Sequence, residues 1–267
     1  MFKIKNLWDN DDVKITNQLQ GFSVLEYTRD LSVTPNNAAE AFFSSQMNIH
    51  KKQLICDLSK SPVTIQPGAM QMMIGDVQAT TGIKGAGDFL KKSFRGMATG
   101  ESAIKPEYTG SGTLILEPTY KHILLLDLNN WCEGLVVDDG LFIACDARIR
   151  QKAIARSTFS SAIAGNEGLF NLCFESQHGG VVALESNIPQ DELIVVELQN
   201  DTLKIDGNMA IAWSKSLDFT VERSGKSLIG SAASGEGLVN VYRGTGTVLV
   251  SSVNNTIATL PTMPISK

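Results

Sequence analysis

Three glutamates recur at corresponding places in the sequence, and carboxylates are groups that can hold a metal ion or move a proton. They are Glu101, Glu167 and Glu236, each next to a glycine. Three converging carboxylates would suit a divalent cation. A carboxylate that accepts backbone N–H groups at a turn would also recur once per repeat, whereas a catalytic group is needed only once. The recurrence therefore favours a structural role, and we expect no metal site and no cofactor.

Other catalytic signatures are incomplete. His50, His122 and His178 are isolated, and no metalloprotease or nucleophile-elbow motif accompanies them. Ser224–Ser227 reads Ser-Gly-Lys-Ser, like the end of a phosphate-binding loop, but Thr220 stands where that motif needs its first glycine. The four cysteines form no C-x-x-C pair, which favours small buried side chains over a metal or redox site. The sequence therefore predicts a protein that is not an enzyme.

Basic residues gather in three segments, 82–96, 146–157 and 222–227. These segments hold ten basic and three acidic residues, a net charge of +7, while the rest of the chain has 13 basic and 25 acidic residues, a net charge of −12. If the three segments are equivalent loops, an acidic protein presents a basic face. The ten candidate binding residues are Lys84, Lys91, Lys92, Arg95, Arg148, Arg150, Lys152, Arg156, Arg223 and Lys226.

The first basic segment is also amphipathic. Leu90, Phe94 and Met97 follow helical spacing, with basic residues on the other side. Such a surface suits a protein partner or an anionic membrane, so we predict a non-enzymatic β scaffold that presents a basic loop face to one of these. RNA binding through the same loops is an alternative, but the segments lack the interleaved aromatic residues that stack on bases. An enzyme or metal-binding protein that uses the recurring glutamates is the other alternative.

The elements that position these residues are predicted from an internal repeat. Three apolar strands end in an acid followed by leucine, and the leucines lie at 58, 128 and 198, two spacings of 70. Each is followed by a glycine-led apolar strand and, later, by a second glycine-rich segment that we expect to form a hairpin turn. The glycine-led strands are 68–73, 140–144 and 207–212, and the later segments are 110–116, 178–184 and 244–250.

These repeats predict an all-β fold of three tandem modules, arranged with pseudo-threefold symmetry as β-sandwich or short double-stranded β-helix units. The only helices expected are near Ala38 to Met47 and in a turn or two at 88–95. Exposed sheet edges could also support a homo-oligomer. The expected divisions are an N-terminal extension, 1–52; modules 53–121, 122–191 and 192–253; and a loosely ordered tail, 254–267.

The composition and the lengths of the apolar runs predict where in the cell the protein is located. The 267 residues are 43% hydrophobic and 19% charged, with a net charge of −5. No apolar run approaches the roughly 18 residues that a membrane-spanning helix needs, and Asp9, Asp11 and Asp12 stand where an export signal would be apolar. We expect a cytoplasmic protein, with contact to a membrane surface as an option.

Several of the glycine motifs resemble a known family. Pro67–Met70, the loop 81–87, Gly100–Ser102 and Gly-Glu-Gly-Leu at 235–238 look like the prokaryotic family related to the mitochondrial biogenesis protein "altered inheritance of mitochondria twenty-four". The resemblance covers about residues 50–253 and implies three modules similar to the tryptophan RNA-binding attenuation protein, with no established catalytic activity. This chain departs from the family by a longer N-terminal region and a shorter run of glycines at 82–87.

Overall fold

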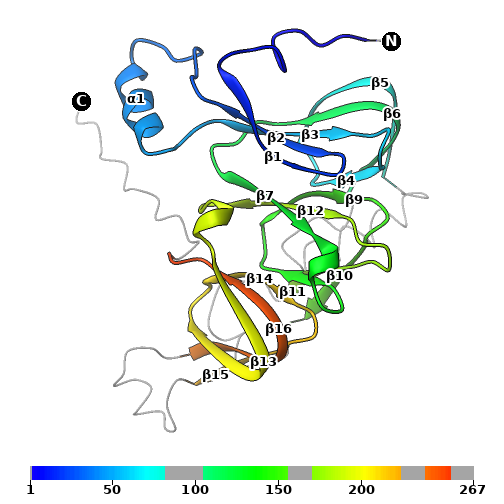
Figure 1. Ribbon diagram of the computed structural model, residues 1–267, viewed down its shortest axis with the longest axis vertical. Helices are drawn as coiled ribbons and strands as arrows, with labels where there is room; N and C mark the ends of the chain where they lie inside the picture. The colour runs from blue at the N-terminus through cyan, green and yellow to red at the C-terminus, as the bar shows by residue number, and fades with distance from the viewer. Residues whose placement is uncertain (1, 82–104, 156–169, 224–237, 254–267) are drawn as a thin grey trace, which may run out of the picture.

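The computed structural model describes residues 2–81, 105–155, 170–223 and 238–253 and is mostly β-sheet (Figure 1). The all-β prediction is confirmed. The helix expected near Ala38 to Met47 is α1 (Ala38–Gln46). The structure also has two short 3-10 turns, η1 (Leu128–Asn130) and η2 (Gln190–Glu192). Within the described ranges, no helix is long and apolar enough to cross a membrane.

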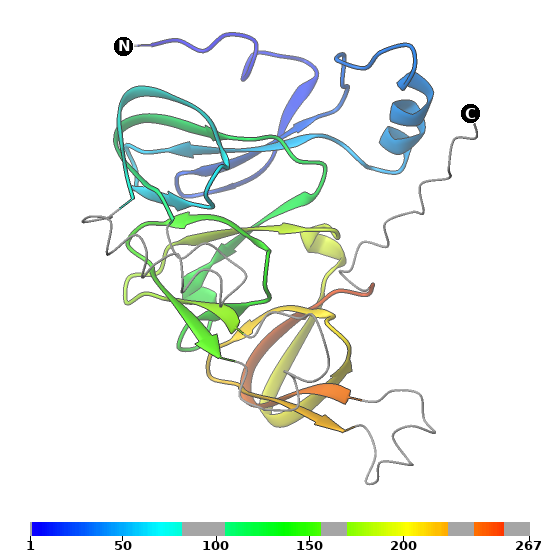
Figure 2. The same cartoon turned by 180° about the vertical axis from the view of Figure 1, so that it is seen from behind.

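A first sheet fills the upper half of the molecule in Figures 1 and 2 and is nearly closed into a barrel. Its strands run in the order β1-β2-β3-β6-β4-β9-β12-β7, and β5 pairs with β6. The strand bounds are β1 (Val13–Leu19), β2 (Phe22–Tyr27), β3 (Lys52–Asp57), β4 (Val63–Ile65), β5 (Met70–Thr80), β6 (Glu107–Leu116), β7 (His122–Asp127), β9 (Phe142–Asp146) and β12 (Val181–Ser186).

A second sheet lies below it and forms a half-barrel. Its order is β10-β11-β8-β14-β16-β13, with β15 on β16. The strands are β8 (Leu135–Val137), β10 (Arg150–Ala155), β11 (Phe170–Glu175), β13 (Ile194–Asp206), β14 (Ala210–Ser214), β15 (Asp218–Arg223) and β16 (Leu238–Val250).

The same pairing order occurs three times along the chain. In each repeat the strand that carries the acid of the acid-leucine pair is antiparallel to the last strand of the repeat, and that last strand also pairs with the glycine-led strand. The three sets are β3-β6-β5, β7-β12-β9 and β13-β16-β14. The third strand was expected to end at Leu198, but β13 continues to Asp206. The residue skipped by a bulge is also equivalent: Gln71, Ile143 and Ile211. The repeats nevertheless share two sheets, since β4 pairs with β9 and β8 with β14. The pseudo-threefold arrangement and the module boundaries stay predictions.

The glycines have two structural roles. Gly68, Gly140 and Gly207 lie at turns before the glycine-led strands with φ of +82°, +74° and +64°, as expected for turn glycines. The prediction of a hairpin turn at Gly110 and Gly244 was wrong, because both lie inside the long strands β6 and β16. A repeat of short apolar runs does not distinguish two strands joined by a turn from one long strand with a glycine in the middle.

Apolar side chains fill the space inside and between the sheets. One buried cluster includes Phe22, Leu54 and Leu114 inside the first sheet. A second includes Phe174 and Ile211, where the two sheets meet. The burial of these apolar strand residues stabilises the fold, because it removes apolar surface from water and packs it closely.

Candidate functional site

Most of the predicted basic residues lie outside the described residues. Lys84, Lys91, Lys92, Arg95, Arg156 and Lys226 are in this group. Arg223 ends β15, and its side chain is likewise not described. Arg148, Arg150 and Lys152 lie at the turn between β9 and β10 and in β10. The recurring Glu101, Glu167 and Glu236 also fall outside the described ranges, as does the expected helix at 88–95.

Of the three candidate binding residues whose side chains the structure describes, two are engaged in ion pairs. Arg148 Nε donates a 2.9 Å hydrogen bond to Asp146 Oδ1, and Asp146 is buried. Burial by itself raises the pKa of Asp146, but hydrogen bonds from Arg148 outweigh it and hold that pKa below its usual value. Lys152 pairs with Glu175, which also contacts Lys215 at 3.0 Å. Both side chains therefore have a structural role within the fold.

Replacing Arg148 by Ala should lower the free energy of unfolding by about 1–2 kcal/mol, because the buried Asp146 carboxylate loses charged hydrogen-bond donors. The neighbouring Arg150, which is exposed, is the matched control, and Arg150→Ala should change the same free energy by less than about 0.5 kcal/mol. Urea unfolding of the two variants measures both values. Equal losses would contradict a specific role for the Arg148 pair.

Side chains that could hold a metal ion do not cluster in the described part of the chain. Among those residues, no three His, Cys, Asp or Glu side chains are placed to hold a metal ion. Burial raises the pKa of Cys56 and Cys145 well above the usual value, and that of Cys173 to about 11. These thiols therefore stay protonated at neutral pH and are poor nucleophiles.

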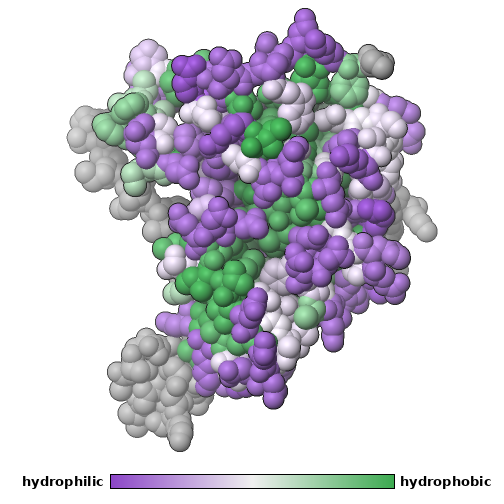
Figure 3. Space-filling view, viewed as in Figure 1, coloured by the Kyte–Doolittle hydropathy of each residue, from purple (hydrophilic) through white to green (hydrophobic). Residues whose placement is uncertain are grey.

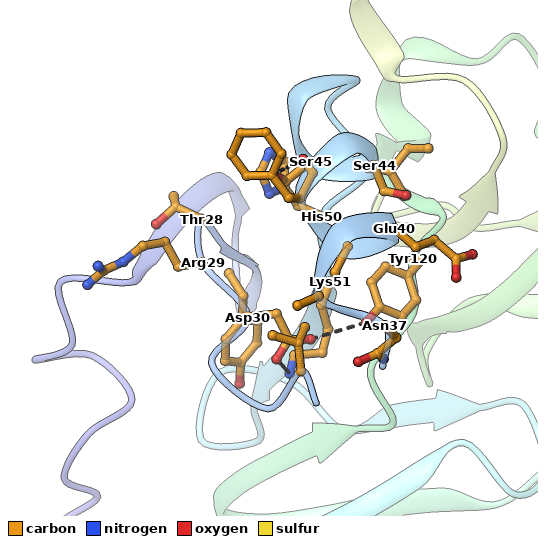
Figure 4. Close-up of a pocket in the computed structure, with 16 residues that line it drawn as sticks. Thr28, Arg29, Asp30, Asn37, Glu40, Ser44, Ser45, His50, Lys51 and Tyr120 are labelled. Carbon is orange, nitrogen blue, oxygen red and sulfur yellow. Dashed lines mark hydrogen bonds and ion pairs between the residues drawn. The ribbon is translucent and has the colours of Figure 1, made fainter. Parts of the chain in front are cut away.

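The described surface does contain a cleft of about 570 Å³ beside α1 (Figure 4). One wall is α1 with the segment before it, and the other is the end of β2, the segment that leads into β3 and Tyr120. Tyr27, Phe42 and Ile49 make much of the wall apolar. A cleft of this size falls in the range of ordinary small-ligand sites.

The turn before α1 contributes Val33 and Asn37 to the lining of the cleft. Asn37 stands at the N-cap position of α1, but its side chain makes no capping hydrogen bond to the helix. Its side chain turns back instead, and Asn37 Oδ1 accepts hydrogen bonds from Thr34 N at 2.7 Å and Thr34 Oγ1 at 2.8 Å. None of the nine α1 residues is buried, so the helix stands off the sheet as Figures 1 and 2 show.

Asp30 is the centre of the polar contacts in the cleft. It accepts hydrogen bonds from Ser32 N at 3.0 Å and Tyr120 Oη at 3.1 Å, and Lys51 Nζ lies 3.3 Å from it (Figure 4). The Ser32 hydroxyl, with help from Lys51, lowers the pKa of Asp30 to about 2. Lys51 also lies 4.6 Å from the centre of the Tyr27 ring. The carboxylate thus stays ionised and paired at neutral pH, which suits binding rather than proton transfer.

Sequence reasoning did not find this cleft. Asp30, Lys51 and Tyr120 come from three separate segments, and no spacing rule links them. The one usable signal was the pair of aromatic residues Phe42 and Phe43 on an expected short helix, which α1 exposes to solvent.

Comparison with known proteins gives the family. The family model described as mitochondrial biogenesis AIM24 matches residues 44–253. This chain belongs to the AIM24 family. The resemblance seen in the glycine motifs is therefore confirmed, and the matched range includes all three repeats together with His50, Lys51 and Tyr120 of the cleft. Tyr27 and Asp30 precede the matched range.

The relatives of this AIM24-family chain include streptococcal proteins. An uncharacterised protein of Streptococcus pyogenes serotype M6 is 29% identical over 199 residues, which covers 72% of this chain and 77% of that protein. A crystal structure of a Streptococcus pyogenes protein is similar with a TM-score of 0.55 and 26% identity, covering 77% of this chain and 89% of that one. These likenesses support the fold and name no activity.

Proposed function

We propose that this AIM24-family protein is a non-enzymatic β scaffold that presents its basic segments to an anionic surface, either a membrane or an acidic protein partner. The observation that supports it is the position of the strands around these segments. Thr80 pairs with Glu107, Ala155 with Phe170 and Arg223 with Leu238, each across an antiparallel pair of strands. The two ends of each connecting segment therefore lie next to each other, and each segment includes at least one basic residue.

The ion pairs of the described residues are consistent with a binding protein. Asp30, Asp146 and Glu175 are each paired with a basic side chain, and their pKa values are lowered. An enzyme that uses general acid–base catalysis needs a group whose pKa lies near the working pH. The basic residues of 82–96 carry the proposed contact with the anionic surface, since Arg148 and Lys152 are already paired.

Changing Lys91, Lys92 and Arg95 together to Glu should weaken sedimentation with vesicles that contain phosphatidylserine by more than about 100-fold, because each basic residue near an anionic surface contributes about 1 kcal/mol. The matched control changes the exposed Lys3, Lys5 and Lys60 to Glu, which alters the net charge equally but outside the basic segments. This control should bind like the original protein at equal ionic strength.

The vesicle experiment also separates the two kinds of anionic surface. Absence of vesicle binding by the original protein overturns the membrane form. Equal loss in both triple variants would mean that net charge, and not the basic segment, governs binding. An acidic protein partner would then be sought with the same pair of variants by affinity purification from the native organism.

A further inference from the structure

β3 and β13, the equivalent strands of the first and third repeats, differ in what lies on their second edge. β3 pairs with β6 on one edge and with β2 on the other, where Phe22 lies opposite Cys56 and Leu25 opposite Gln53. The equivalent strand of the third repeat, β13, pairs with β16 and is the last strand of its sheet. Within the described residues, no strand pairs with the other edge of β13.

The missing neighbour leaves apolar side chains in solvent. Leu54 and Ile55 of β3 are 1% and 3% exposed, whereas the residues 140 positions later, Ile194 and Val195 of β13, are 51% and 57% exposed. Figure 3 shows a hydrophobic area in the lower half of the molecule, where Figure 1 places β13 and β16. A free sheet edge with apolar side chains is a ready site for pairing with another strand.

We infer that the free edge of β13, over Ile194–Leu198, binds the same edge of a second copy of this chain in an antiparallel pair. A two-fold axis at Val196 places Ile194 opposite Leu198 of the second copy and Val195 opposite Glu197 of the second copy. Such an isologous contact opposes no like charges. It also continues the apolar cluster that contains Val196 and Leu198 across the new pair.

The length of the contact is set by β13 itself. The pairing with β16 is interrupted by a bulge between Leu198 and Asp201, and Asn200 has a φ of +53°. A bulge bends the strand and ends regular pairing. Beyond it, Asp201, Lys204 and Asp206 are exposed charged residues that disfavour pairing with another strand. The paired edge is therefore about five residues a side, which predicts a weak dimer that forms reversibly with concentration.

Sedimentation equilibrium of the full chain over a wide concentration range tests the contact. The original protein should show a monomer–dimer equilibrium, and hydrogen exchange at 194–198 should slow as the dimer forms. Val195→Glu should weaken the dimer at least tenfold, because the two-fold axis brings the new carboxylate opposite Glu197 of the second copy. The double variant Val195→Glu with Glu197→Lys should restore the dimer, because opposite charges then face each other.

The remaining outcomes overturn the inference. A chain that stays monomeric up to millimolar concentration overturns it, as does a dimer that Val195→Glu leaves unchanged. Hydrogen exchange at 194–198 could already be slow in the monomer and become fast when residues 254–267 are removed. That result would assign this edge to the chain's own C-terminal segment. Far-UV circular dichroism and the thermal midpoint confirm that each variant is folded, so a lost dimer cannot be mistaken for unfolding.

Discussion

Glu26→Gln should lower the free energy of unfolding by about 3–5 kcal/mol, since it removes the carboxylate of a largely buried ion pair. Glu26 and Lys52 are 5% and 4% exposed, and Glu26 Oε2 lies 3.6 Å from Lys52 Nζ. A second ammonium group, that of Lys14, lies 2.9 Å from Glu26 Oε1. Without the carboxylate, Lys52 stays buried beside another positive charge. Urea unfolding at neutral pH measures the loss.

The contribution of Glu26 to the free energy of unfolding depends on pH, in a direction set by its pKa shift. Burial raises the pKa of Glu26, but the ammonium groups of Lys14 and Lys52 outweigh it, so that the pKa is lower than the ordinary value of 4.5. A carboxyl group with a lowered folded-state pKa stabilises the protein above its unfolded-state pKa, and this stability is lost as the pH falls through the folded-state pKa. The difference between the original protein and Glu26→Gln should therefore shrink in acid.

Two control variants separate the buried pair from surface charge. Lys14→Gln removes a half-exposed partner and should cost at most about 1 kcal/mol. Glu26→Leu combined with Lys52→Leu removes both charges and should recover most of the loss, because buried ion pairs are often no more stable than apolar replacements. A loss below about 1 kcal/mol in Glu26→Gln would mean that water reaches Lys52 when its partner is absent.

Much of the fold could be predicted because the repeat is recognisable from its glycines and apolar strands. Gly68, Gly140 and Gly207 each precede an apolar strand, and a turn with positive φ requires this residue type. The recurring order of landmarks then gave the strands their sequence order. It could not give their partners, because β4 pairs with β9 and β8 with β14 across repeats, and such pairing depends on how the sheets close.

The candidate sites were less predictable because charge counting ignores pairing in space. Lys152 and Glu175 lie 23 positions apart, yet β10 and β11 bring them together. The count that made 146–157 a basic segment therefore included side chains already engaged in the fold. The cleft beside α1 escaped prediction for the same reason, because the Asp30 and Tyr120 that form its polar contacts are 90 residues apart in sequence.

Gly110→Ala should lower the free energy of unfolding by about 3 kcal/mol, at the upper end of the cost of a strained backbone conformation. Gly110 lies inside β6 with a φ of +117°, a conformation that residues with a side chain rarely adopt. A Cβ atom there would lie 2.1 Å from the carbonyl oxygen of Asp76 in the neighbouring β5. Because that atom is backbone, the clash can be relieved only by moving the paired strands apart. The urea midpoint should fall with an unchanged slope.

Gly68→Ala separates the clash from the backbone conformation. Gly68 also has a positive φ, of +82°, but a Cβ atom there has no other heavy atom within 4 Å. Its replacement should cost only the backbone term, about 1–2 kcal/mol. Hydrogen exchange should show faster opening of β5 and β6 in Gly110→Ala and not in Gly68→Ala, since only the first variant separates Val77 from its partner strand. Equal losses in the free energy of unfolding of the two variants would mean that the close approach of β5 and β6 is not the reason for a glycine inside β6.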